Sequence, residues 1–503
     1  MSKNNSVFEL VHSLTKAEKR YFKLYTSLQQ GSKEYTRLFT LIEKATDIDE
    51  VKKKYAAQKK SALFDANCKY LYKVIMDALL QFTIEADKTS RLINATLKAR
   101  ILFQKSMYNE GFSLLEKIKT EAAKNEEFVI ELLAVQLELY YLGIVGFHTI
   151  TEKQLVQKQM KIDELLKYQK NIHQQTSLYE LLRHRLLYKG TVRTKEQKDD
   201  LNDLVVSELN YNSNPLANTF ESDRIHLLFQ SYYFITINDA KSALKTLHEL
   251  NGLMENHKHL WIERPIDYLG TVEGVLESLL YTKEHTEFEP FINKLQGLEI
   301  KSAHFEVMLE RIRFIYGVAG FLNSGEFEKA ESVKRDYEHS LFKKLYLLDP
   351  GKQAEVYLYS AIIFIGKGDM NKAHKELNKV LLERKANHHL PFYRTFRLLH
   401  LLVHYELGNH EYIEYEIRSL KRTTIKEYKK SYLVERIVFR FLQHQPLPSS
   451  LKAREMIWQK FRESFDKMAK IKYELQLLHI FDFATWIKAK LLRESFGDLL
   501  KVK

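Results

Sequence analysis

Histidines have the spacing most specific for chemistry in this sequence. Five of the 19 histidines lie within residues 388–410, and two of these, His400 and His404, are four residues apart. On one helix this spacing places both imidazoles on the same face, where they could bind zinc or nickel. A third ligand would come from His388, His389 or Glu406. The alternative is a histidine-rich helix end, and from the sequence alone we assign no metal ligand and no cofactor.

Carboxylates also occur at helical spacing. Glu273 and Glu277 are one turn apart, and a second group comprises Glu411, Glu414 and Glu416. General acid–base catalysis needs carboxyl groups whose pKa values are pushed apart, whereas an ordinary solvated helix face has the same spacing. The sequence has no phosphate-binding glycine loop and no GxGxxG, GxSxG or HExxH motif. We therefore predict that the protein is not an enzyme.

A basic cluster near the N-terminus comprises Lys52, Lys53, Lys54, Lys59 and Lys60. These lysines could meet phosphates if residues 49–57 and a helix from residue 62 onward form a helix-turn-helix pair. The connection between these helices has no glycine, and we expect Tyr70 and Tyr72 in the apolar core. A charge run of this kind is typical of a solvated face. Binding of DNA or RNA by an N-terminal domain is therefore the alternative function.

The elements that position these residues are helices. The 503 residues include 17 glycines and 7 prolines, where average usage would give about 35 and about 25. Sandwiches, barrels and propellers need glycine and proline at their turns, which excludes them here. With 45% hydrophobic residues the chain can form a core. The sequence thus predicts an all-α fold.

Charge and cysteine content favour a cytoplasmic protein. The net charge of +13 is distributed unevenly: both ends are basic and residues 201–300 are acidic. A nucleic-acid groove along the whole chain would be expected to keep one sign of charge. We find no secretion signal, and the most apolar stretch, residues 132–147, is too short to cross a membrane. The single cysteine, Cys68, excludes an internal disulfide, and we expect an unreactive thiol.

A repeating helical hairpin is clearest in residues 347–385. Asp349-Pro350-Gly351 breaks the chain, a helix follows to about Ile365, and a second helix starts near Met370 after a turn at Gly368. Equivalent turns recur along the chain at intervals of 39–48 residues. They lie at Ser106, His148, Val192, Asn238, Thr286, Gly325, Gly368, Gly408 and Pro448.

Two positions repeat relative to these turns. Four residues before the turn, where the first helix should pack on its partner, are Leu102, Ile144, Tyr188, Phe234, Phe321 and Phe364. Five residues after it, where the two helices would approach closely, are the small residues Gly111, Ala243, Ala330, Ala373 and Ala453.

The hairpin resembles the tetratricopeptide repeat. That family has an aromatic residue late in the first helix, a Gly-Asp type of turn and a small residue five positions after the turn glycine; Phe364, Gly368 and Ala373 match, and Pro350 precedes the first helix. The resemblance is best over residues 301–422, although the spacing exceeds the family's 34 residues. It implies a superhelical α-solenoid of about nine hairpins, whose first helices line a concave surface.

Three arginines share one register in this series. Arg224, Arg311 and Arg394 each lie 14 residues before a turn, near the expected start of a first helix, where the helix dipole slightly disfavours a positive charge. The resemblance places them on the concave surface, where a row of guanidinium groups would bind a carboxylate-bearing peptide. The alternative is that these are three ordinary surface arginines and that their common register results only from the choice of turns.

Three domains are predicted. Residues 1–88 form an N-terminal helical domain, with helices at about 6–13, 15–29, 33–46, 49–57 and 61–86; Thr15 and Glu18 fit a capping box. Residues 89–448 are the tetratricopeptide-like repeats, and residues 449–503 supply two long capping helices. We expect loops at residues 27–32 and 210–218. The leading functional hypothesis is a non-catalytic scaffold that binds a protein or peptide partner along the concave face.

Overall fold

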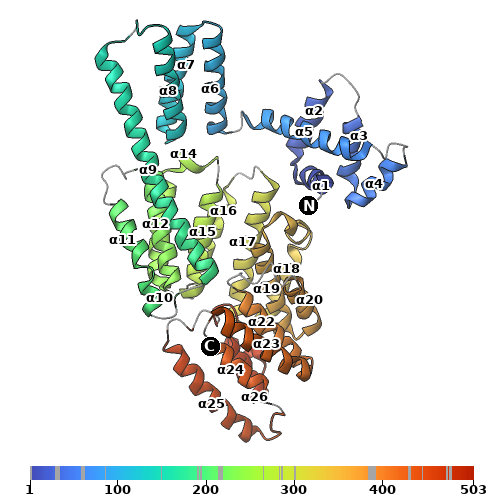
Figure 1. Cartoon of the computed structure of the whole chain (residues 1–503). Helices are drawn as coiled ribbons and strands as arrows, with labels where there is room; N and C mark the ends of the chain where they lie inside the picture. Colours follow the sequence, from blue (N-terminus) through green and yellow to red (C-terminus); the bar gives the residue numbers. More distant parts are fainter. Residues whose placement is uncertain are drawn as a thin grey trace. The chain divides into compact units, whose positions relative to one another are not determined.

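The computed structural model of the protein is built from helices (Figure 1). It describes residues 3–28, 34–57, 63–84, 87–148, 150–189, 192, 195–212, 219–263, 265–282, 284, 287–298, 302–382, 392–428, 432–444, 446–471, 474 and 478–502. These residues form 26 α-helices and one short 3-10 helix, with no strand among them. The predicted all-α class is therefore confirmed.

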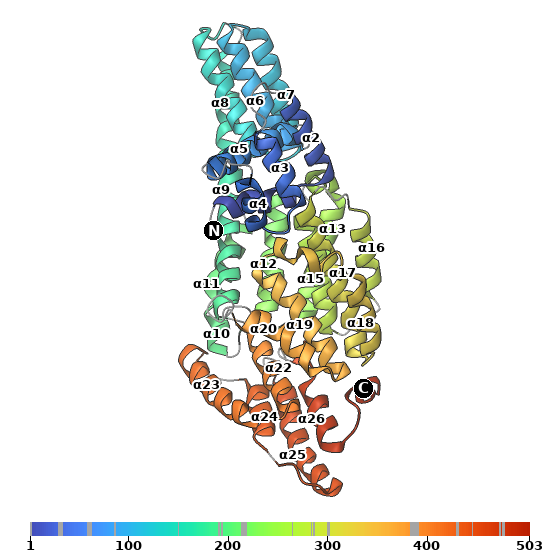
Figure 2. The ribbon, with the colours of Figure 1, turned by 90° about the vertical axis from the view of Figure 1, so that its right-hand side faces the viewer.

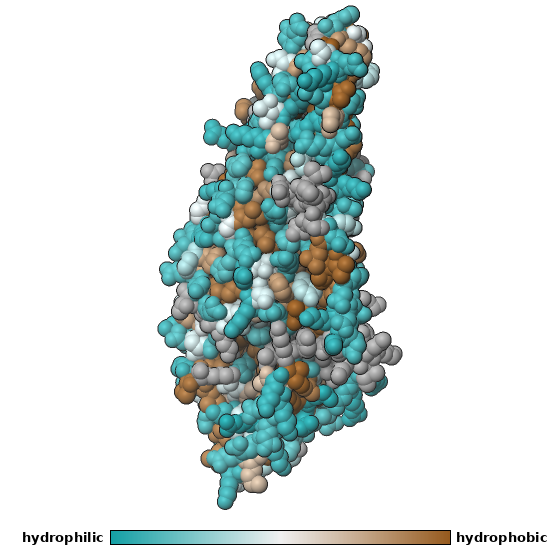
Figure 3. Space-filling model, turned by 90° about the vertical axis from the view of Figure 1, so that its left-hand side faces the viewer, coloured by the Kyte–Doolittle hydropathy of each residue, from teal (hydrophilic) through white to brown (hydrophobic). Residues whose placement is uncertain are grey.

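The chain divides into two compact units. The first comprises Met1–Asn171, His257–Pro265 and Glu299–Glu306, and the second comprises Ile172–Asn256, Ile266–Leu298 and Val307–Lys503. In the described part of the chain, no helix combines the length and apolarity needed to cross a membrane. Figure 3 shows one face of the surface, where hydrophobic residues form separate small patches among hydrophilic ones.

The first unit contains the N-terminal helices, α14 and the start of α9. Their bounds are α1 Lys3–Ser13, α2 Lys16–Ser27, α3 Glu34–Lys44, α4 Ile48–Ala56, α5 Phe64–Ile84, α6 Lys88–Gln104, α7 Tyr108–Lys124, α8 Phe128–Ile144, α9 Glu152–Lys189 and α14 Lys258–Trp261. The five N-terminal helices predicted from the sequence are confirmed within a few residues at each end.

Helix α5 is the centre of an N-terminal hydrophobic core and packs against α1, α2, α3 and α4. Its buried residues recur every three or four positions, as the 3.6-residue period of a helix requires, and include Phe64, Cys68 and Leu71. Burial, with the nearby carboxylate of Asp65, raises the pKa of the Cys68 thiol to about 12. The thiol is therefore protonated and unreactive at neutral pH, as the sequence predicts.

The capping box at the start of α2 is also confirmed. The backbone N–H of Glu18 donates to Thr15 Oγ1 at 3.3 Å, and the backbone N–H of Thr15 donates to Glu18 Oε2 at 2.7 Å. These two bonds satisfy N–H groups that a helix start leaves without an intrahelical acceptor.

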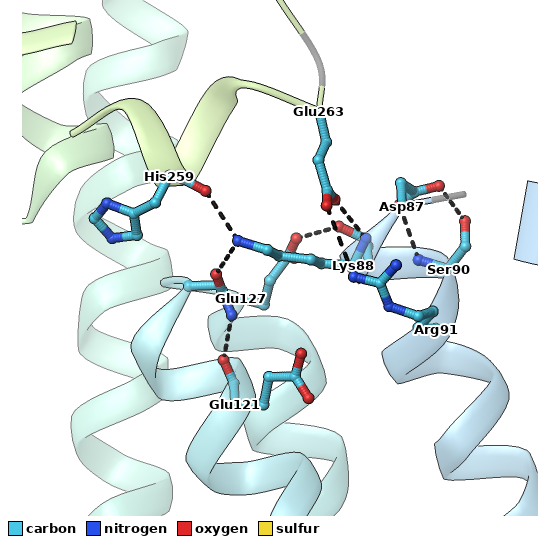
Figure 4. Close-up of polar contacts among 10 residues, drawn as sticks. Asp87, Lys88, Ser90, Arg91, Glu121, Glu127, His259 and Glu263 are labelled. Atoms are coloured by element: carbon cyan, nitrogen blue, oxygen red, sulfur yellow. Dashed lines mark hydrogen bonds and ion pairs between the residues drawn. The ribbon is translucent and has the colours of Figure 1, made fainter. Parts of the chain in front are cut away.

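Polar contacts attach the segment around α14 to α6 within the first unit (Figure 4). Glu263 Oε2 accepts a hydrogen bond from the backbone N–H of Lys88 at 2.6 Å, and its other oxygen lies 3.7 Å from Arg91. Lys88 Nζ in turn donates to Asn125 Oδ1 at 3.1 Å and to the carbonyl of His259 at 3.2 Å. A short segment remote in sequence thereby joins the first unit.

The second unit continues in paired helices (Figure 2). Their bounds are α10 Lys195–Asp199, α11 Asn202–Asn212, α12 Phe220–Thr236, α13 Ala240–Asn256, α15 Ile266–Thr282, α16 Phe288–Gln296, α17 Ala303–Asn323, α18 Phe327–Asp336, η4 Phe342–Leu347, α19 Pro350–Lys367, α20 Met370–Leu381, α22 Tyr393–Glu406, α23 His410–Tyr428, α24 Leu433–Leu442, α25 Leu451–Ala469, α26 Phe483–Leu492 and α27 Phe496–Lys501. Helix α17 begins in the first unit at Ala303 and continues in the second.

Five of the predicted turns have the same backbone geometry. The turn residue has a positive φ at Ser106, Asn238, Gly325, Gly368 and Gly408. At Gly368, for example, its N–H donates to the carbonyl of Ile365, and the N–H of Asp369 donates to that of Phe364. This pair of hydrogen bonds is the Schellman motif, which satisfies the last carbonyls of a helix. The position four residues before the turn is therefore fixed by hydrogen bonding at the helix end.

The small residues after the turns are placed as predicted at four of five positions. Gly111, Ala243, Ala330 and Ala373 are buried, whereas Ala453 is only half-buried. A Cβ added to Gly111 would lie 2.7 Å from the ring of Phe103, so the preceding helix approaches too closely for a larger residue there.

The predicted turn at His148 is wrong by two residues. The two hydrogen bonds of the Schellman motif are centred on Gly146, which has a φ of 70°. The residue four positions before this turn is therefore Leu142, which is buried. Ile144, predicted to pack there, is 53% exposed. Leu142 and Ile144 are both bulky and apolar, so side-chain size alone does not show that the turn lies two residues, or half a helical turn, earlier.

A second correction concerns the chain between His148 and Val192. The turn series implies two helices there, but the structure has one, α9, which extends from Glu152 to Lys189. The reason is that residues 152–189 contain no glycine or proline to end a helix. Tyr188, predicted to pack near the end of a first helix, is 61% exposed. The turn predicted at Thr286 lies outside the described residues.

The remaining loop predictions are in part wrong and in part outside the described residues. Residues 210–212 are the end of α11, while 213–218 lie outside the described part, as do 29–32 of the first predicted loop.

The C-terminal segment forms three helices where two were predicted. Asp482 accepts a hydrogen bond from the N–H of Thr485 and so begins α26, and Arg493, with a φ of 58°, ends it before α27. Trp486 of α26 is 1% exposed, and its Nε1 donates to Glu406 Oε1 at 2.9 Å.

The two positive-φ glycines Gly325 and Gly368 allow a matched stability test. A Cβ at Gly325 would lie 2.3 Å from the backbone oxygen of Gly497, whereas nothing lies within 4 Å of one at Gly368. We expect Gly368→Ala to cost about 1–2 kcal/mol from its left-handed backbone alone. Gly325→Ala should cost more, because it also displaces α27.

The check is the apparent Tm of both variants, with limited proteolysis of the C-terminal helix. Gly320→Ala is the control, since Gly320 lies inside α17 with no atom near an added Cβ. Equal losses for Gly325→Ala and Gly368→Ala would contradict the proposed contact.

Candidate functional site

Arg311 is buried at the centre of a charge network in the second unit. It lies in the middle of α17 rather than near its start, because α17 begins at Ala303, eight residues earlier than the register suggests. Its side chain is 1% exposed and forms hydrogen-bonded ion pairs with Glu273 of α15 and Glu355 of α19. Burial by itself would lower the pKa of Arg311, but the two carboxylates raise it above its ordinary value. The guanidinium therefore stays charged and joins three helices.

The other two arginines of the register also pair with carboxylates of this chain. Arg224 makes two bonds of 2.7 Å to Glu221 and lies 3.8 Å from Asp267 of α15. Arg394 lies 3.4 Å from Glu435 of α24, and its guanidinium is 4.7 Å from the ring centroid of Tyr432. Each arginine thus connects its own helix to the first helix of a neighbouring hairpin.

These contacts correct the role expected for Arg311. The sequence predicts that a partner's carboxylate compensates the three guanidinium groups, whereas Arg311 is enclosed and compensated by its own chain. The spacing could not reveal this, because Glu273 and Glu355 lie 38 and 44 residues away in the sequence. Partner binding by Arg224 and Arg394 stays a prediction.

The carboxylates around Arg311 outnumber it. Glu273 and Glu277 lie one turn apart on α15, as predicted, and with Glu355 they form what we call the acidic cluster. Glu277 is solvent-exposed, yet desolvation by its crowded surroundings and the negative charges of Glu355 and Glu273 raise its pKa to about 7. Desolvation, together with the charge of Glu273, also raises the pKa of Glu355 despite the nearby Arg311. Three carboxyl groups thus share one guanidinium, and two of them, Glu277 and Glu355, hold a proton more tightly than an ordinary glutamate.

The N-terminal lysines lie on the surface of the first unit. Lys52, Lys53 and Lys54 are exposed on α4, and Lys54 forms an ion pair of 2.5 Å with Glu50. Lys59 and Lys60 lie outside the described residues. The expectation that Tyr70 and Tyr72 belong to the core is wrong: they are 50% and 41% exposed. Only the residue between them, Leu71, faces the core, because neighbouring residues on a helix point about 100° apart.

A charged pocket in the first unit lies among α7, α8 and α9, with a volume of about 700 Å³. Glu138 accepts ion pairs from Lys119 at 2.7 Å and Lys158 at 2.8 Å, and Glu131 lies 3.3 Å from Lys161. These internal pairs explain how acidic residues are tolerated in the apolar helix α8.

Three histidines come together in the second unit. His400 and His404 share one face of α22, as predicted, and His374 of α20 adds a third imidazole. One ligating nitrogen from each lies within 4.8 Å of the others. Of the expected third ligands, His388 and His389 lie outside the described residues, and Glu406 is bonded to Trp486 and Lys490.

His374 was missed because it belongs to the preceding hairpin. The order of the hairpins could have revealed it, because the second helix of one hairpin packs on the first helix of the next. Here α20 packs on α22. The histidines line a pocket of about 380 Å³. Burial and the nearby His374 lower the pKa of His404 to about 4, so His404 is neutral at pH 7.

Comparison with known proteins does not identify the chain: no family model and no curated protein matches its sequence.

Replacing Arg311 tests the charge network. We expect Arg311→Met to destabilise the second unit by roughly 3–5 kcal/mol, because it leaves the half-buried carboxylates of Glu273 and Glu355 uncompensated. Arg418→Met is the control: Arg418 pairs with Glu414 at 3.0 Å, but both side chains are more than 60% exposed, so the loss should stay within about 1 kcal/mol.

The loss of stability caused by Arg311→Met should depend on pH. The pKa values of Glu277 and Glu355 are already raised, and removing the guanidinium raises them further. A raised carboxyl pKa means that the folded state binds protons more tightly than the unfolded state, so destabilisation is full at high pH and declines as pH falls. The difference in apparent Tm between Arg311→Met and the native protein should narrow between about pH 8 and about pH 5. A pH-independent loss equal to that of Arg418→Met would contradict the network.

Proposed function

We propose that the protein is a non-catalytic helical scaffold that binds a partner protein through a lysine- or arginine-bearing segment at the acidic cluster. The resemblance of residues 301–422 to tetratricopeptide repeats supports stacked hairpins that share a core and expose a long face. In such a solenoid of about nine hairpins, the first helices, including α15, α17 and α19, would line the inner surface.

The observation that carries the proposal is the excess of carboxyl groups around Arg311, with Glu277 as the third. Glu277 is an exposed residue, while Glu273 and Glu355 engage Arg311. A partner's ammonium or guanidinium group near Glu277 would offset the desolvation and the repulsion that raise its pKa, and it would gain a charge-assisted hydrogen bond. The chain as a whole carries +13, so attraction of a cationic segment must come from a local site.

The surroundings of the acidic cluster suit a peptide rather than a reaction. Tyr281 hydrogen-bonds Glu277, and the Tyr316 hydroxyl donates to the carbonyl of Glu273 at 3.4 Å. Burial raises the pKa of Tyr316, followed by the effect of nearby carboxylates, so its hydroxyl stays protonated at neutral pH. Aromatic side chains with polar tips are enriched in protein interfaces.

Charge reversal at Glu277 tests this proposal. Glu277→Lys should weaken binding of a fluorescent oligolysine peptide at low salt by about tenfold or more, because it replaces attraction by repulsion. The same variant should lose the proteins that co-purify with the full-length chain from its host.

Glu249→Lys is the matched control. Glu249 is exposed on α13 in the same unit, 4.0 Å from Lys245, and its reversal changes net charge equally. The proposal would be overturned if both substitutions weakened peptide binding equally, or if neither weakened it.

A second candidate function, nucleic-acid binding by the N-terminal helices, is favoured by one observation. Lys52, Lys53 and Lys54 are exposed on α4, and exposed Tyr70 and Tyr72 on α5 could stack on bases. We expect such binding to fall steeply between low and moderate salt and to weaken in the triple alanine variant of the three lysines. No binding of a fluorescent duplex or single strand at low salt would exclude it.

A further inference from the structure

The cluster of His374, His400 and His404 has the composition of a metal site. His400 and His404 are separated by one turn of α22, and the packing of α20 on α22 brings in His374. Ring centroids are 4.5 Å apart for His400 and His404, 5.0 Å for His374 and His404, and 5.3 Å for His374 and His400. Three imidazoles from two helices therefore converge on one point.

The distances fit a site that closes on a metal through small side-chain movements. Zinc binds histidine nitrogen at about 2.0–2.1 Å, so tetrahedral ligands lie about 3.4 Å from one another. The nitrogens here lie within 4.8 Å, and χ rotations of the partly exposed His374 can shorten that separation. His400, only 6% exposed, is held in place by its helix.

A neighbouring amide can orient one of these ligands. The amide nitrogen of Asn409 lies 2.9 Å from His404 Nδ1. If the amide turns by 180°, its oxygen accepts from a protonated Nδ1 and leaves the Nε2 lone pair for a metal, the arrangement that commonly fixes ligating histidines.

Charges near the cluster do not oppose a cation. The cationic group that lines the pocket is Arg397, and it is paired with Glu416 of α23, which is 2% exposed. The ring of Tyr412 lies 4.1 Å from that of His404 and covers one side. The pocket leaves room for a water molecule as a further ligand.

We propose that His374, His400 and His404 bind a divalent metal ion of the zinc class, with a fourth position open to the pocket. Imidazole ligands favour zinc, copper and nickel over magnesium and calcium, which prefer oxygen. Three histidines with one open position are also the ligand set of many zinc sites that bind an exchangeable water. The site is independent of the acidic cluster, so either can exist without the other.

Zinc binding to the chelator-stripped, full-length protein tests the site. We expect one zinc ion bound tightly enough to compete with a chromophoric chelator and to raise the apparent Tm. His374→Gln and His404→Gln should each weaken binding by roughly tenfold or more, because each removes a ligand. Replacement of zinc by cobalt should give the visible absorption bands of tetrahedral coordination.

His410→Gln is the control, since His410 is exposed on α23 and lies outside the cluster. It should bind zinc like the native chain, which reports on background binding by the other histidines among the 19. Equal zinc affinity in the native protein and in the variant with all three histidines replaced would overturn the proposal. Absence of tetrahedral cobalt bands in the native protein would also overturn it, without dependence on how any variant folds.

Discussion

The buried guanidinium of Arg311 is the constraint on which the second unit depends. A charge removed from water requires opposite charge nearby, and here Glu273 and Glu355 supply it from the helices on either side. One side chain of α17 thereby fixes the positions of α15 and α19. Arg224 and Arg394 make the corresponding links to α15 and α24, so first helices are joined by ion pairs as well as by apolar packing.

The same network leaves an excess of carboxyl groups in this part of the unit. Two carboxylates satisfy Arg311, and a third, Glu277, is left exposed beside them with a raised pKa. The ion pairs hold the helices together, and the same arrangement leaves a third carboxyl group beside them, at which we propose that a cationic segment binds. A bound lysine or arginine would relieve the repulsion that the fold retains.

Hairpin geometry explains both the regular turns and the histidine cluster. The Schellman motif, repeated at five predicted turns, sets where each first helix ends and the second begins. Since α20 follows directly from the turn at Gly368 and packs on α22, His374 meets His400 and His404. A local backbone motif thus determines which remote side chains come together.

The sequence by itself determined the helical class, the five N-terminal helices, most turn positions and the face shared by His400 and His404. These depend on local rules: the 3.6-residue period, capping residues, and glycine or a few other residues at positive φ. Tertiary structure alone decided that Arg311 is enclosed, that Glu355 and His374 join sites begun on other helices, and that Tyr70 and Tyr72 face solvent. Those outcomes depend on which faces of different helices pack together, and the separation of Arg311 from its carboxylates by about forty residues leaves no trace in local spacing.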